Sequence, residues 1–95
     1  MTNCPESLKP TVDLLRLAFP DGVDCDDVAS LMRVFYDHMC DENLAKVFAC
    51  WLGLDEFVLV NEVYRSALLS ESDARVIAFK SILETKGFPE WLKSD

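Results

Sequence analysis

The sequence predicts an all-α fold, a single compact domain of about five short helices over residues 1–95, packed orthogonally or as a bundle. Three observations support this class. The 95 residues suffice for one hydrophobic core. Apolar residues recur at helical spacing in five segments, and the short breaks between them are rich in Pro, Gly and Asp. Residues 1–6 are a candidate for a disordered start.

The first two predicted helices flank the turn Pro20-Asp21-Gly22. The first runs from about Leu8 to Ala18, with Pro10 in its first turn, where a missing N–H costs little. The second runs from Cys25 to about Met39, with Asp24 as N-cap and Asp27 answering it as in a capping box. Residues expected in the core are Leu8, Val12, Leu15, Phe19, Val28, Leu31, Met32, Phe35 and Met39.

Three more helices follow. The third covers 42–52, is capped by Asp41 and ends at Gly53. The fourth begins after Asp55, and a helical wheel gives it one broad apolar face. The members of that face are Phe57, Leu59, Val60, Val63, Tyr64, Ala67 and Leu68, with Val58 and Leu69 opposite. The fifth spans about 71–86, with Ser70 and Asp73 as a capping box; Gly87 and Pro89 stop it, and Trp91 folds back on the domain.

The charge is strongly negative and concentrated. The net charge is −8, and residues 21–42 hold seven acidic residues against Arg33 alone, a net of −6. Such a field repels nucleic acid, so direct nucleic-acid binding is not expected, and it favours a protein partner with a basic surface. No stretch has the about 18–20 apolar residues of a membrane span, and the N-terminus lacks a secretory signal, so a cytoplasmic location is expected.

The four cysteines contain no C-x-x-C pair. In a reducing cytoplasm disulfides are rare, so Cys4, Cys25, Cys40 and Cys50 are expected to be small buried hydrophobes with free thiols.

The acidic stretch Phe19–Asp27 does not match a calcium loop. An EF-hand needs Gly at position 6 and Glu at position 12. Counted from Asp21, Gly falls at position 2 and Met32 at position 12; counted from Asp24, position 12 is Phe35. Helix capping and an acidic docking face remain the two interpretations of this stretch.

The sequence gives no sign of catalysis or of a cofactor. His38 and Cys40, two positions apart on a helix, diverge by about 200° and cannot share a metal site without ligands from elsewhere. There is one histidine, no phosphate-binding loop and no nucleophile elbow. A non-enzyme without metal or cofactor is therefore predicted.

The leading functional prediction is a small acidic module that docks a basic protein partner, with an inhibitor or immunity-type protein as a specific variant. Apolar residues crowd positions 52–59, either as an exposed interface or folded inward. The candidate partner-binding residues are Asp21, Asp24, Asp26, Asp27, Asp37, Asp41, Glu42, Phe57, Val58 and Leu59. The alternatives are a metal- or redox-responsive protein that uses His38 and the cysteines, and a self-associating subunit such as a homodimer.

Three breaks carry a family resemblance: Phe19-Pro20-Asp21-Gly22-Val23, Asp41-Glu42 and Gly87-Phe88-Pro89. In their order and spacing, from about residue 10 to 91, the chain resembles a family of short all-helical proteins, a domain-of-unknown-function family known mainly from mycobacteria and their relatives. The chain departs from that family in its four cysteines, its lower Ala and Arg content, and Ser70-Glu71-Ser72 in place of Pro-Ser. The resemblance implies an all-helical fold and no particular activity.

Overall fold

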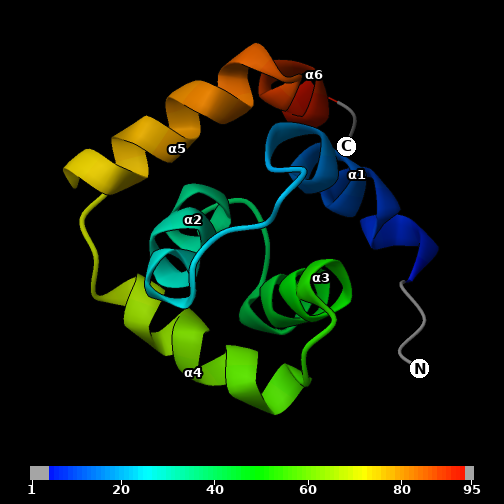
Figure 1. The fold of residues 1–95 in the computed structure, drawn as a ribbon, viewed down its shortest axis with the longest axis vertical. Helices are drawn as coiled ribbons and strands as arrows, with labels where there is room; N and C mark the ends of the chain where they lie inside the picture. The colour runs from blue at the N-terminus through cyan, green and yellow to red at the C-terminus, as the bar shows by residue number, and fades with distance from the viewer. Residues whose placement is uncertain (1–4, 94–95) are drawn as a thin grey trace.

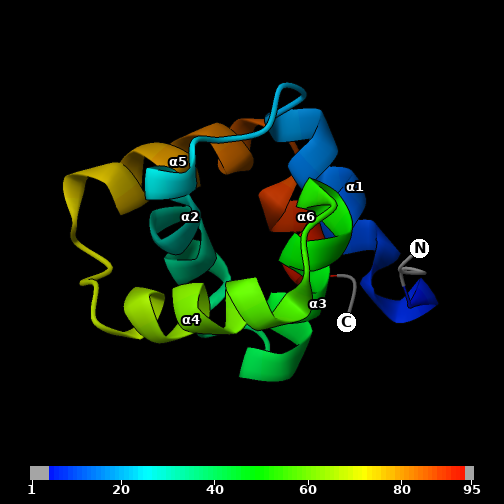
Figure 2. The same cartoon turned by 60° about the horizontal axis from the view of Figure 1, so that its bottom comes forward.

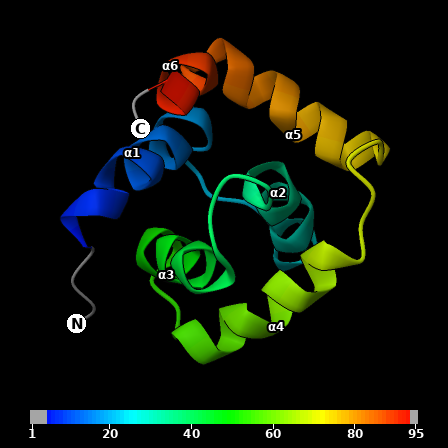
Figure 3. The ribbon, with the colours of Figure 1, turned by 180° about the vertical axis from the view of Figure 1, so that it is seen from behind.

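One helix, α2 (Val28–Phe35), is buried on almost every side, and the other helices surround it. The structure is a computed structural model that describes residues 5–93. Every residue of α2 except Arg33 is buried, as befits a helix that is apolar all round. Two opposite views, Figures 1 and 3, both show α2 inside a ring of helices.

Within residues 5–93 the chain forms six α-helices and two short 3₁₀ helices without any strand, which confirms the all-α prediction. The 3₁₀ helix η1 (Glu6–Leu8) leads into α1 (Lys9–Ala18), and η2 (Cys25–Asp27) leads into α2. The remaining helices are α3 (Asp41–Leu52), α4 (Glu56–Ala67), α5 (Ala74–Thr85) and α6 (Phe88–Lys93). Of the predicted disordered start, Glu6 is helical and residues 1–4 lie outside the described residues.

The ring closes through contacts between elements far apart in sequence. The central α2 packs against α4 and α5, α3 packs against α1 and α4, and α1 contacts α5 and α6. In the tilted view of Figure 2, α3 and α4 cross at a steep angle. Aromatic rings fill the middle: Phe35 meets Phe88 edge to face at 5.6 Å and Trp91 at 5.2 Å, measured between centroids.

Several predicted helix ends are wrong, and the backbone explains why. The Asp24 and Asp27 side chains make no capping bond, because the Asp24 carbonyl itself accepts from the Asp27 N–H at 2.9 Å within the 3₁₀ turn. Cys40, not Asp41, is the N-cap of α3, and it has no side-chain cap. Helix α2 ends at Phe35 rather than near Met39.

At α5 the cap is Asp73 rather than Ser70. The Asp73 carboxylate accepts from the N–H groups of Arg75 at 2.9 Å and Val76 at 3.4 Å. Helix α5 ends at Thr85, just before Gly87 (φ +116°), as predicted. A further helix that was not predicted, α6, begins at Phe88 with Pro89 in its first turn, where proline is tolerated. Trp91 folds back on the domain as predicted, and its indole N–H donates to Thr11 Oγ1 at 2.8 Å.

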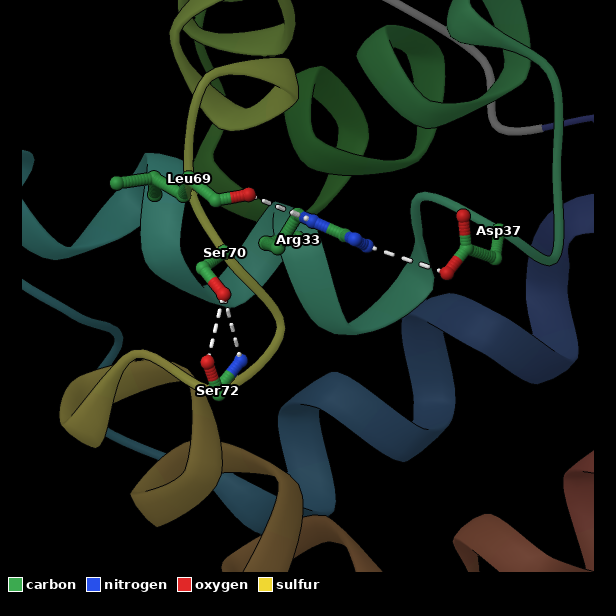
Figure 4. Close-up of polar contacts among 5 residues, drawn as sticks. All are labelled: Arg33, Asp37, Leu69, Ser70 and Ser72. Carbon is green, nitrogen blue, oxygen red and sulfur yellow. Dashed lines mark hydrogen bonds and ion pairs between the residues drawn. The ribbon is translucent and has the colours of Figure 1, made fainter.

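The one charged residue of α2 joins three elements. Arg33 Nε donates to the Leu69 carbonyl at 3.0 Å, in the connection between α4 and α5, and its Nη1 contacts Asp37 Oδ2 at 3.2 Å (Figure 4). The guanidinium also lies 5.5 Å from the centre of the Tyr36 ring. A cation on the most buried helix is thus accommodated by a carbonyl, a carboxylate and an aromatic face.

Candidate protein-binding surface

A groove of about 220 Å³ runs between α3 and α4. Its floor is apolar, because Ala45, Val60 and Val63 face it where the two helices cross. Three carboxylates and one phenol stand at its edge: Asp41, Glu42, Glu56 and Tyr64. This volume is below the about 300–1,000 Å³ typical of small-molecule sites, so the groove fits a single long side chain better than a cofactor.

One of these carboxylates, Glu42, is paired with a lysine of the same helix. Lys46 Nζ lies 3.2 Å from Glu42 Oε1, one helical turn away. The hydrogen bond from Lys46 to Glu42, and then the charge of Glu42, raise the pKa of the Lys46 ammonium. Asp41 and Glu56 form no ion pair with any other described residue, so the edge of the groove keeps a negative excess.

The outer side of α4 carries an exposed apolar stripe, defined by Phe57, Tyr64 and Leu68. These side chains are 83%, 64% and 88% exposed. They follow one another at i, i+7 and i+11, and therefore lie within about 40° on the helical wheel. In Figures 1 and 3, α4 forms the lower edge of the ring, and no other helix covers its outer side.

This stripe corrects the predicted orientation of α4. Leu59, Val63 and Ser66 are the buried residues, and Leu59 is only 1% exposed. Leu59 therefore cannot contact a partner, and its prediction as a binding residue is wrong. Phe57 and Val58 are exposed as expected of contact residues, and Tyr64 and Leu68, which the helical wheel placed on the same apolar face as Leu59, are exposed as well. The i, i+7, i+11 spacing was visible in the sequence, but it does not by itself tell an outer stripe from an inner one.

Only two of the predicted acidic residues line the groove, and the others lie elsewhere in the fold. Asp41 and Glu42 line it, and Asp37 pairs with Arg33 at the end of α2. Asp27 pairs with Arg75 on α5, 48 positions away. Asp21, Asp24 and Asp26 are exposed in the α1–α2 connection, and their side chains form no hydrogen bond or ion pair with a described residue.

The cysteines differ from the prediction of buried free thiols. Cys25 and Cys40 are exposed and free, because each lies at the start of a helix rather than on its inner face. Cys50 on α3 is half-buried and disulfide-bonded. Cys4 lies outside the described residues.

His38 is exposed, with its ring 6.0 Å from that of Phe88 and 6.1 Å from that of Trp91. Among residues 5–93 no group of three His, Cys, Asp or Glu side chains is placed to hold a metal ion. No helix in the same part of the chain is both long and apolar enough to span a bilayer.

Comparison of the chain with protein-family models, with curated proteins and with solved structures yields no match. The family resemblance therefore stays a prediction, and the assignment of function depends on the surface itself.

Proposed function

We propose that this protein is a non-enzymatic, acidic binding module that docks a basic surface of a protein partner. One observation carries the proposal: Asp21, Asp24, Asp26 and Asp41 are exposed, and their side chains neither cap a helix nor pair with any residue of 5–93. Exposed carboxylates without a side-chain partner in the fold are available for intermolecular contacts, and their charge steers a cationic partner. An inhibitor or immunity-type protein is the specific variant of this function.

The same charge argues against other macromolecules. With a net charge of −8, the chain is expected to repel both nucleic acid and anionic lipid surfaces. The cytoplasmic location stays a prediction from the sequence, and the disulfide at Cys50 argues for a compartment that is not strongly reducing.

A selection experiment tests the proposal. The immobilised protein is offered a displayed library of random peptides at about 0.1 M and about 1 M salt, between which the Debye length falls from about 10 to about 3 Å. We expect peptides rich in Lys and Arg to be enriched at low salt only. A variant with D21N, D24N, D26N and D41N is expected to lose the enrichment.

The matched control removes the same number of charges elsewhere, with the exposed residues changed as D13N, E71Q, E84Q and E90Q. This control is expected to retain the selected peptides. The proposal is overturned if the wild-type protein enriches no peptide above bare matrix. Equal enrichment by both variants at both salt concentrations overturns it as well.

Self-association is the second candidate, because the stripe of Phe57, Tyr64 and Leu68 is large and uncovered in the described chain. Light scattering at low micromolar concentration distinguishes self-association from the docking module. A stable dimer that F57S with L68S converts to monomer favours self-association, whereas a monomeric wild-type protein favours the docking module.

A further inference from the structure

We propose that the groove between α3 and α4 receives one lysine or arginine side chain from a basic amphipathic helix of the partner. This inference rests on the proposed function and deepens it, because it assigns the contact to one place and one partner chemistry. Its occupant is a helix whose apolar face lies along α4.

The two parts of the groove match the two parts of a long cationic side chain. Lysine and arginine combine an apolar stem with a charged head, and they bury the stem where apolar surface is offered. Here Ala45, Val60 and Val63 supply that surface, while Asp41 and Glu56 supply carboxylates for the head. Charge-assisted hydrogen bonds to carboxylates are among the strong polar contacts in proteins.

The apolar stripe explains why a helix, rather than an isolated cation, is the expected occupant. Tyr64 belongs both to the groove lining and to the stripe, so the two features are continuous. A helix that lies along α4 would cover Phe57 and Leu68 with its apolar face. A cationic residue at the border of that face then reaches the groove beside Tyr64.

Other occupants fit the charge less well. A second copy of this chain would bring another net charge of −8 against the same acidic edge. An anionic membrane would be repelled for the same reason.

The test is a titration followed by backbone amide NMR shifts. The probe is a synthetic peptide of about 16 residues, long enough for a helix, with leucines on one face, lysines on the other and one lysine at their border. Its twin carries acetyl-lysine at that border position, which keeps the length and removes the charge. We expect the lysine peptide to shift the amides of Ala45, Val60 and Tyr64, and to bind ~10-fold more tightly than its twin.

Variants provide the second arm. D41N with E56Q is expected to weaken the lysine peptide ~10-fold and to leave the acetyl-lysine peptide unchanged. The control, E71Q with E84Q, removes two exposed carboxylates that belong neither to the groove nor to the proposed docking residues, and it should change either affinity less than ~2-fold. Because the wild-type protein with the two peptides already tests the contact, a misfolded variant would not leave the question open.

The outcomes separate the two proposals. Shifts confined to residues 21–27, or equal affinity for both peptides, would overturn the groove assignment and leave the acidic docking module standing. No binding of either peptide would overturn the groove assignment, while the library selection would still decide the proposed function independently. Shifts in α4 that depend on protein concentration alone would replace the partner helix by a second copy.

Discussion

The indole N–H of Trp91 donates to the Thr11 hydroxyl at 2.8 Å, a contact between residues 80 positions apart that holds α6 against α1. Thr11 is buried, and the Trp91 ring also lies edge-on to Phe35 and stacks on Phe88. The hydrogen bond between Trp91 and Thr11 and this cluster of rings therefore help to hold the last helix against the domain.

Removing the acceptor of this bond should destabilise the fold. In T11V the shape of the side chain is kept but the indole loses its Thr11 acceptor, and we expect the free energy of unfolding to fall by about 1–2 kcal/mol. T11S keeps the hydroxyl and should retain more of the stability. Urea unfolding followed by tryptophan fluorescence measures both, and equal losses in the two variants would contradict the role of the hydrogen bond.

The contact between Arg33 and the Leu69 carbonyl should matter more than the contact between Arg33 and Asp37. Arg33 is largely buried, whereas Asp37 is exposed. We expect R33M to lower the free energy of unfolding by about 1.5–3 kcal/mol, because the Leu69 carbonyl loses a charged donor. D37A removes only a surface ion pair and should cost less than about 0.5 kcal/mol. Thermal unfolding of the two variants ranks the contacts, and a reversed order would show that the ion pair dominates.

Two aspartates that look alike in the sequence should differ in their effect on stability. Asp73 accepts two backbone N–H groups at the start of α5, and the Asp24 side chain accepts none. We expect D73A to cost about 1 kcal/mol and D24A to change the stability by less than about 0.5 kcal/mol. Chemical denaturation of both variants checks this. A comparable loss in D24A would restore the capping role that the sequence suggested.

The orientation of α4 can be tested with three apolar residues. Leu59 is buried, so L59A should cost about 2–5 kcal/mol through the cavity that it leaves. Phe57 and Leu68 are exposed, so F57S and L68S should each stay within about 0.5 kcal/mol of the wild type. Denaturation midpoints decide the matter. Large losses in F57S or L68S would mean that another surface already covers the stripe.

The exposed thiols bear on the redox alternative. Cys25 and Cys40 are solvent-accessible, so both should react with Ellman's reagent in the folded protein. The double variant C25S with C40S should lose two equivalents of this reaction compared with the wild type. If mild oxidation changes neither partner binding nor electrophoretic mobility, the thiols have no regulatory role.

Local sequence patterns were sufficient for most of the fold. The 3.6-residue period placed the helices, and Gly53 ends α3 in the left-handed conformation (φ +69°) that glycine adopts readily. The predicted helix ends were less accurate than the predicted helices, because a capping side chain and a backbone carbonyl compete for the same N–H groups. At Asp24 the backbone carbonyl of a 3₁₀ turn takes the donor, and no local pattern announces that outcome.

The sequence predicted the kinds of residue that form the candidate surface, but not their arrangement. The sequence indicated an excess of carboxylates and an apolar surplus near Phe57, but not which side of α4 faces outward. Two sets of apolar residues on α4 could each have formed the buried side: one contains Leu59 and Val63, and the other contains Tyr64 and Leu68. Ser66 joins the buried set because its hydroxyl donates to the Val63 carbonyl at 2.6 Å within the same helix, so a polar residue is tolerated inside.

The sequence by itself thus determined an acidic, all-helical chain and the approximate span of each helix, since spacing, turn residues and charge are local properties. Only the tertiary structure decided which carboxylates form an ion pair, as Asp27 does with Arg75, and which form none with a described residue. The tertiary structure alone also brought Asp41 and Glu42 beside Glu56 and Tyr64. These relationships depend on how helices cross, and a crossing is fixed by the packing of side chains from segments that are distant in the sequence.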